Sequence, residues 1–564
     1  MRLAQTLQPG DTRLVLDRAV DWAAGDLIVV TTTDYLPGHS EALQITQVID
    51  ARTLEVARID PFTNEITTET NTGVQYTHNG EAYPLGAIPE RLGLDFTHVD
   101  TRAAVALLSR SIRIVSAGAA FGQPFPKPLV RCGDDSPGCQ YFGGHTIVRQ
   151  GVTIYQVQAV EFYQLGQGGR LGHYPVHFHM ARKTARNTFV KDCSIHDSMT
   201  RWITLHATHD VMLKRNVGYL SIGHGYYLED GTEINNQFHA NIGLYARAVA
   251  EIDEETPQRD NPRQVPGILS APPIGYCSND NTKTCTANDQ CGVGNACLLP
   301  RSMPYQSDWV HPTVFWIMNG WNEFEGNMAA GAGACGACYW PVTGSIRGPS
   351  RDMTWESYAS IQKGADRGGT APLKQFTKNY CTTAMHSFNS TPDTAECLGV
   401  VSGSSKRLNQ IPNPLALQYN PDVAQESYYP IVVQTLPAYT RCDKADCSTV
   451  EKCANDKRDN CMVAVLDRYI SSFHWAPTNF SAIWLRPRWF LVINSVLTDV
   501  QNAGLTFVTG GDCTHSSVIP GNWMLARKNV FIGHTQAENP LAANAGPFNP
   551  AGLACDNPYT EANN

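Results

Sequence analysis

Three histidines and one glutamate in this sequence have the chemistry and the spacing expected of a shared polar site. His177 and His179 are separated by one residue, and His206 and Glu229 follow at similar intervals along the chain. An H-x-H pair joined by another histidine and a carboxylate is a ligand set for a divalent transition metal such as zinc or copper. The same groups could also transfer protons in catalysis. We therefore predict that these four side chains form one metal-binding or catalytic cluster.

Three short segments, in which apolar and polar residues alternate, would bring these side chains together. They are Tyr174–His179, Arg201–His206 and Gly225–Glu229. Alternate residues of a β-strand face opposite sides, and neighbouring strands lie about 4.8 Å apart. Stacking the segments predicts one outward column of His179, His206 and Glu229, and a second column of His177, Thr204 and Tyr227. We expect both columns on an exposed face, because burying four ionisable groups without partners would be costly.

A repeat surrounds these segments. From about Ser109, a β-branched or aromatic run followed by Asn or Gly recurs, and Asn187, His209 and Glu233 are offset by 22 and 24 residues. A period in the twenties with several short strands per repeat is typical of a parallel β-helix. The predicted fold class is all-β: a right-handed parallel β-helix with an N-terminal β-rich segment and disulfide-stapled loop insertions.

Changes in composition divide the chain into four expected parts. Short β-rich runs separated by turn residues precede the repeat, and a polar stretch rich in Pro and Asn interrupts it. We predict an N-terminal β-rich segment at 1–118, the first part of the β-helix at 119–250, a Cys-rich insertion at 251–310, and a continuation of the β-helix with long loops at 311–564.

Composition excludes several classes of protein. The 564 residues are 42% hydrophobic and 17% charged, which excludes intrinsic disorder and a coiled coil. A net charge of −9 without a Lys/Arg-rich run argues against nucleic-acid binding. The apolar runs are far shorter than the roughly 18 residues of a membrane span, and Met1–Gly10 lacks the apolar core of a signal peptide. We therefore expect no nucleic-acid partner and no transmembrane segment in this chain.

The 17 cysteines occur mostly in short-range clusters. Such usage is typical of an oxidising compartment, so we expect a secreted or cell-surface protein. Pairing of near neighbours predicts four disulfides: Cys132–Cys139, Cys335–Cys338, Cys381–Cys397 and Cys513–Cys555. Cys193 lies in an apolar, strand-like stretch and is predicted to be a buried free thiol.

Several motifs in order resemble a known family. They are Tyr174–Met180, Cys193–His196, Thr204–His206, Gly223–Gly231, Phe315–Ile317 and Asn327–Gly331, with Thr33–Glu41 and Asp100–Arg110 upstream. Together they resemble the cell-migration-inducing and transmembrane cell-surface hyaluronidases, whose β-helix core is shared by fibrocystin-like receptors. The resemblance covers roughly Gly10–Gly331 and departs from the family pattern at Ala104 and Ala106. It implies a right-handed parallel β-helix at the cell surface and, in the hyaluronidase branch, endo-cleavage of hyaluronan.

The leading hypothesis is an extracellular enzyme that cleaves a glycosaminoglycan-like or other extended polysaccharide along the β-helix face. We assign catalysis to Glu229, His206 and Asp230, with Glu229 as the acid or base. His177, His179, His206 and Glu229 are the candidate ligands of one divalent transition metal. The alternatives are a non-catalytic adhesion or structural β-helix, in which the histidines form a structural ladder, and a metal-dependent oxidase acting on a polymer.

Binding of a polyanionic sugar chain requires local features, because the net negative charge gives no global attraction. The aromatic residues expected to stack on sugar rings are Tyr227 and Trp202, with Tyr339 and Trp340 as further candidates. The basic residues expected to attract the polyanion are Arg182 and Lys183, with Arg186 beside them.

Overall fold

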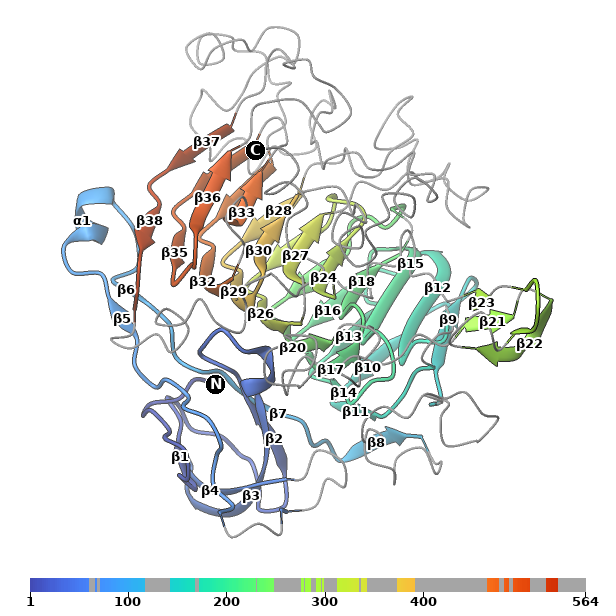
Figure 1. The fold of residues 1–564 in the computed structure, drawn as a ribbon, viewed down its shortest axis with the longest axis horizontal. Helices are drawn as coiled ribbons and strands as arrows, with labels where there is room; N and C mark the ends of the chain where they lie inside the picture. The colour runs from blue at the N-terminus through green and yellow to red at the C-terminus, as the bar shows by residue number, and fades with distance from the viewer. Residues whose placement is uncertain are drawn as a thin grey trace, which may run out of the picture.

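The computed structural model describes backbone at residues 1–59, 66–67, 71–116, 143–167, 172–229, 231–247, 275–277, 279–285, 291–295, 297–298, 312–333, 336–341, 373–390, 464–475, 481–485, 490–507 and 524–535. Within this part of the chain, three parallel sheets extend along one common axis (Figure 1). Successive strands of the chain move from one sheet to the next, so each turn adds one strand to every sheet. The predicted parallel β-helix is therefore confirmed.

The strands of each sheet follow one another along the axis in chain order. The first sheet holds β10 (Gln156–Gln158), β13 (Phe189–Lys191), β16 (Met212–Lys214), β19 (Gln237–His239), β25 (Glu323–Glu325), β28 (Gln375–Thr377), β31 (Ala464–Asp467), β34 (Phe490–Ile493) and β37 (Met524–Arg527). The second sheet holds β8 (Ile112–Val115), β11 (Val160–Tyr163), β14 (Ser194–His196), β17 (Val217–Ile222), β20 (Ile242–Arg247), β26 (Met328–Ala332), β29 (Tyr380–Ala384), β32 (Ile470–His474), β35 (Val496–Thr498) and β38 (Val530–Ile532). The third sheet holds β9 (Thr146–Arg149), β12 (Val176–Lys183), β15 (Ile203–His209), β18 (Tyr226–Leu228), β24 (Thr313–Ile317), β27 (Ala337–Pro341), β30 (His386–Asn389), β33 (Ser481–Leu485) and β36 (Ala503–Phe507).

Asparagines and left-handed turn residues connect the first sheet to the second. The side-chain oxygens of Asn241, Asn327 and Asn379 each accept a hydrogen bond from the backbone N–H of the asparagine one turn earlier, all at 3.0 Å. The residue before each ladder asparagine has a positive φ, as at Arg215 (53°). The asparagine ladder thus satisfies backbone groups at a bend that strands alone would leave unpaired.

The N-terminal segment forms a separate antiparallel sheet that packs on the β-helix. Its strands are β1 (Arg13–Val15), β4 (Thr53–Arg58), β3 (Glu41–Asp50), β2 (Leu27–Val30) and β7 (Val105–Leu107), in that order. The smaller elements here are η1 (Pro37–His39), β5 (Tyr83–Pro84), α1 (Ile88–Leu92) and β6 (His98–Val99). Val29, Ala104 and Ala106 pack in one buried cluster with Leu244 and Ala330 of the second sheet. The departures from the family pattern at Ala104 and Ala106 therefore lie in this contact.

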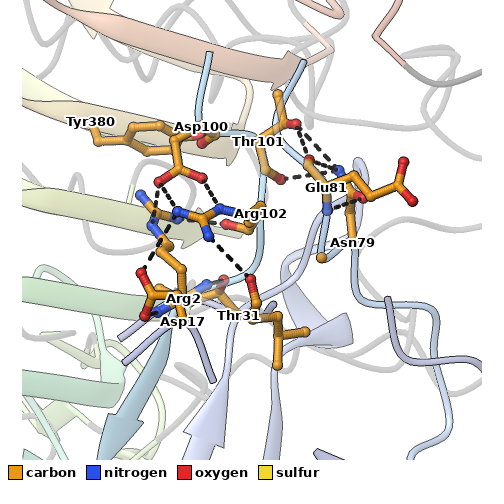
Figure 2. Close-up of polar contacts among 12 residues, drawn as sticks. Arg2, Asp17, Thr31, Asn79, Glu81, Asp100, Thr101, Arg102 and Tyr380 are labelled. Carbon is orange, nitrogen blue, oxygen red and sulfur yellow. Dashed lines mark hydrogen bonds and ion pairs between the residues drawn. The ribbon is translucent and has the colours of Figure 1, made fainter. Parts of the chain in front are cut away.

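Charged residues form a balanced cluster at the same contact, shown in Figure 2. Arg102 forms a bidentate ion pair with Asp100, at 2.7 and 3.0 Å, and also lies 3.7 Å from Asp17. Arg2 lies 3.5 Å from Asp100 and over the ring of Tyr380. The Tyr380 hydroxyl donates to the Asp100 carbonyl at 2.6 Å. This interface cluster of Arg2, Asp17, Asp100 and Arg102 connects the N-terminal sheet to β29.

The disulfide pattern corrects the sequence-based prediction. Cys338 of β27 is bonded to Cys381 of β29, with a Cα–Cα distance of 5.8 Å, so neither Cys335–Cys338 nor Cys381–Cys397 forms. Both cysteines are buried in the core, and the bond joins the third sheet to the second. Proximity in sequence is misleading because inward-facing residues of successive turns meet across the core. Cys193 is free and buried, as predicted.

The other predictions on cysteines concern two further disulfides and the Cys-rich insertion. Cys132–Cys139 and Cys513–Cys555 lie outside the described residues. Within the predicted Cys-rich insertion, the described backbone forms a three-stranded antiparallel sheet of β21 (Gly275–Cys277), β22 (Asp280–Cys285) and β23 (Cys297–Leu298).

Candidate functional site

Strand register brings the predicted cluster together. In β12 and β15, His177 pairs with Thr204 and His179 pairs with His206. In β15 and β18, Thr204 pairs with Tyr227, and the N–H of Glu229 continues the ladder to the carbonyl of Leu205. Both predicted columns are therefore present. The register shift in β12 falls after His179 and leaves the columns intact.

The four side chains converge on one point. One nitrogen from each of His177, His179 and His206 lies within 4.8 Å of the others. Glu229 Oε2 lies 3.5 Å from His206 Nδ1 and 3.9 Å from His177 Nε2. We call His177, His179, His206 and Glu229 the histidine cluster.

Burial of the histidine cluster corrects the prediction of an exposed face. His177 is 0% exposed, His206 5% and Glu229 6%, and only His179 is half-buried. The side chains point away from the core, as strand parity requires, but neighbouring aromatic residues enclose them. Tyr174 packs edge-on against His177 and its hydroxyl lies 3.5 Å from Glu229 Oε1. The sequence argument assumed that water would solvate these side chains, whereas in the structure they are buried and contact one another.

Burial also lowers the pKa of two of the imidazoles, those of His177 and His179. Desolvation lowers the pKa of His177 to about 3, so the ring is neutral at physiological pH. Its Nδ1 donates to the Gly172 carbonyl at 2.8 Å, which leaves the lone pair on Nε2. That buried Nε2 has no hydrogen-bond partner. Burial, His206 and Arg149 lower the pKa of His179 as well.

These groups fit a transition-metal site. Neutral imidazole is the form that binds a metal, and a carbonyl on the second ring nitrogen is the usual way to orient such a ligand. Ligands about 2.1 Å from a tetrahedral ion are about 3.4 Å from one another. The separations from Glu229 Oε2 to His206 Nδ1, 3.5 Å, and to His177 Nε2, 3.9 Å, are close to that value, and the three imidazole nitrogens lie within 4.8 Å of one another.

A buried arginine borders the histidine cluster. The Arg201 guanidinium lies 4.5 Å from the centre of the Tyr227 ring and 5.4 Å from that of Tyr174. Arg201 is 4% exposed. Sequence reasoning did not select Arg201 or Tyr174, because both precede the alternating part of their segments and have no defined parity.

The predicted sugar-stacking residues are buried. Trp202 is 0% exposed and lies inside the core, where a Cβ on Gly218 or Gly225 would come within 2.4 Å of its ring. Trp202 therefore cannot stack on a substrate. Tyr227 is 1% exposed and packs beside the histidine cluster, while Tyr339 and Trp340 are buried further along the third sheet. These four aromatic residues fill space between turns and do not form an open platform.

The predicted basic residues lie at the end of β12, beyond the register shift. Arg182 is half-buried with a φ of 63°, and Lys183 is exposed and pairs in register with His209. Arg186 is exposed nearby. Asp230 lies outside the described residues. The substrate-binding role of Arg182 and Lys183 and the catalytic role of Asp230 remain predictions.

The other histidines and Glu233 have local partners. His196 lies between Asp197, at 2.7 Å, and Glu161, at 3.4 Å, and these carboxylates raise its pKa despite complete burial. Glu233 accepts backbone hydrogen bonds from Ala207 and Gly231. His209 and His224 each accept one from a backbone N–H, and His239 lies 3.6 Å from Glu323.

Comparisons with known proteins agree with the motifs. Residues 141–273 match the family model described as CEMIP beta-helix. The chain is 27% identical over 336 residues to human cell surface hyaluronidase CEMIP2, covering 58% of this chain and 20% of that protein. It is 28% identical over 282 residues to mouse fibrocystin-L, covering 45% of this chain and 6% of that protein. The predicted resemblance to cell-surface hyaluronidases and fibrocystin-like proteins is confirmed as distant homology.

Further matches add less. Communication mutant protein F of Dictyostelium discoideum is 26% identical over 333 residues, covering 59% of this chain and 22% of that protein. The tailspike protein gp49 of Pseudomonas phage LKA1 is 8% identical, with a TM-score of 0.17 over 94% of this chain and 60% of that chain, and carries no argument. The chain spans only a quarter or less of the length of the curated relatives it matches. None of the helices in the described residues is long and apolar enough to cross a membrane.

Proposed function

We propose that this chain is the catalytic part of an extracellular enzyme that cleaves an extended glycan, in the manner of a hyaluronidase, and that the histidine cluster is its centre. One observation carries the proposal. Three imidazoles and a carboxylate from three successive turns converge on a buried point, and the buried Nε2 of His177 has no hydrogen-bond partner. Strongly perturbed titratable groups that converge in this way are typical of functional sites.

His177, His179 and His206 would hold one divalent transition-metal ion. When bound, such an ion supplies Lewis acidity at the point where the three nitrogens meet. The Gly172 carbonyl keeps His177 in the tautomer that offers Nε2 to the site. Glu229 completes the set, either as a fourth ligand or as the group that accepts and returns a proton.

The role of Glu229 follows from its surroundings. Its carboxylate lies 3.5 Å from both the Tyr174 hydroxyl and His206 Nδ1. A carboxylate held among an imidazole, a phenol and apolar rings is suited to general acid–base catalysis at a glycosidic bond. Asp230, the next residue along the chain, is the second carboxylate we propose for this reaction.

The comparisons support the substrate class and the location. A relative named as a cell surface hyaluronidase aligns with 58% of this chain, and the residues that match the CEMIP beta-helix family model, 141–273, contain the histidine cluster. The disulfide between Cys338 and Cys381 is consistent with an oxidising compartment. We therefore propose hyaluronan or a similar glycosaminoglycan as substrate and a secreted or cell-surface location.

The test is the chain length of hyaluronan after incubation with the wild-type protein or with Glu229→Gln. The wild type should shorten the polymer with new reducing ends, and Glu229→Gln should be slower by at least about 100-fold. Glu325→Gln, which changes a half-buried carboxylate on the first sheet, is the matched control and should retain full activity. Oxidised ends would favour a metal-dependent oxidase. If the wild type does not shorten hyaluronan, the alternative of a non-catalytic adhesion or structural β-helix is favoured.

A further inference from the structure

Arg149 extends the outward column of the histidine cluster by one strand. It is the last residue of β9 and pairs in register with His179 of β12. Residues paired across parallel strands project to the same face, so Arg149 stands beside His179 as His179 stands beside His206. The column therefore reads Arg149, His179, His206 and Glu229, and spans about 14 Å in three strand spacings.

Exposure along this column decreases from Arg149 inward. Arg149 is exposed and His179 is half-buried, whereas His206 and Glu229 are 5% and 6% exposed. β9 is also the terminal strand of the third sheet among the described residues. Among the described residues, the column is therefore most exposed at its β9 end, where Arg149 carries a positive charge.

The exposed end of the column carries positive charge. Arg149 is a cation whose guanidinium forms no hydrogen bond or ion pair within the described part of the chain. The next residue of the column, His179, lies beside it, and Glu229 supplies a carboxyl group at the buried end. An anionic group is therefore attracted to the exposed Arg149 end of the column.

We infer that Arg149 is a substrate-binding residue that recognises the carboxylate of an acidic glycan and sets the direction in which the sugar chain enters. The inference rests on the proposed function, since it concerns the same site. A planar guanidinium matches a carboxylate with two parallel hydrogen bonds, which a neutral sugar cannot provide. Arg149 thus selects uronic-acid-containing chains and places the adjoining glycosidic bond toward His206 and Glu229.

Binding of hyaluronan oligosaccharides by calorimetry tests this inference separately from catalysis. All variants are made in the Glu229→Gln protein, so the probe is not cleaved. Arg149→Gln should weaken binding by about tenfold or more, the value of a charge-assisted hydrogen bond, and Arg149→Lys should weaken it less. Carboxyl-reduced oligosaccharides should bind the Arg149→Gln protein and its parent equally.

Arg527→Gln is the matched control, because Arg527 is also the exposed last residue of a four-residue strand, at the opposite end of the helix. It should bind hyaluronan oligosaccharides as its parent does. Unchanged binding by Arg149→Gln, equal loss for the acidic and carboxyl-reduced probes, or no binding by the parent would overturn the inference. Arg149-dependent binding by a protein whose wild type leaves hyaluronan intact would instead reject the proposed cleavage and leave the inference standing.

Discussion

The interface cluster and the histidine cluster are both polar groups enclosed by protein, but their charges are balanced differently. In the interface cluster, two arginines face two aspartates, and Asp100 is paired with both arginines at 2.7 to 3.5 Å. In the histidine cluster, one carboxylate faces three imidazoles, and the buried Nε2 of His177 has no hydrogen-bond partner. The charges of the interface cluster are compensated within the protein. The histidine cluster instead contains a nitrogen lone pair, on Nε2 of His177, that no hydrogen bond uses.

The contrast indicates what each cluster is for. A balanced ion-pair network stabilises the contact between the N-terminal sheet and β29. Uncompensated polar atoms in a buried site cost stability, and proteins retain them where they bind or react. Substitutions in the interface cluster should therefore affect stability, and substitutions in the histidine cluster should affect activity.

The largest effect is expected for His177→Leu. Loss of an imidazole at the convergence point should lower hyaluronan cleavage by more than about 100-fold. The free energy of unfolding should stay within about 1 kcal/mol of the wild type, because among the described residues His177 loses one hydrogen bond, to the Gly172 carbonyl. Parallel measurements of cleavage and urea unfolding check both expectations. Full activity, or a collapse of stability, would remove the distinction between the clusters.

Arg102→Met should have the opposite profile. The Arg102 side chain is 20% exposed and is paired with Asp100 and Asp17. Its removal leaves two partly buried carboxylates with less compensation, which should lower the free energy of unfolding by about 2 to 3 kcal/mol. Cleavage of hyaluronan by the folded fraction should be unchanged. A variant as stable as the wild type would show that the interface cluster is not a stabilising element.

Acid should weaken the interface cluster further. Burial alone would raise the pKa of Asp100, but the hydrogen bond from Arg102 and the charge of Arg2 lower it overall. A carboxyl group whose pKa is lowered by folding stabilises the protein above its unfolded pKa, about 3.9, and loses that contribution as pH falls through the lowered value. Unfolding free energies measured from pH 7 to pH 2 should show this loss, and Arg102→Met should show a smaller one.

The smallest effect is expected for Tyr380→Phe. The Tyr380 hydroxyl donates one hydrogen bond to the Asp100 carbonyl, and its ring contact with Arg2 would persist in phenylalanine. The loss should be about 1 kcal/mol in the free energy of unfolding. A much larger loss in urea unfolding would mean that this hydroxyl organises the whole interface cluster.

Register was predictable from sequence because alternation in Tyr174–His179 and its successors fixes which side chains share a face. The asparagines and bends of the β-helix were similarly visible as a repeat. Burial of the histidine cluster was not predictable, since parity says which face a side chain lies on but not what covers that face. The same limit explains Trp202, which lies at a bend before β15 where strict alternation does not apply.

Contacts between residues of different turns were also not predictable from the sequence. Cys338 and Cys381 pair because they face the same core from different sheets, and 43 residues separate them in the chain. Arg149 was missed because β9 has only four residues and was not among the alternating segments that the sequence analysis stacked. Its place beside His179 becomes visible only once the strands are stacked.

The metal content of protein purified without chelators or a nickel column tests the central claim most directly. Elemental analysis should find about one divalent transition-metal ion per chain in the wild type and in Arg102→Met, since the interface cluster does not contribute to the site. His179→Ala should lose the ion while its circular dichroism remains that of the folded protein. A wild-type protein with no ion above trace levels, or a His179→Ala variant that retains it, would contradict the assignment of the histidine cluster as a metal centre.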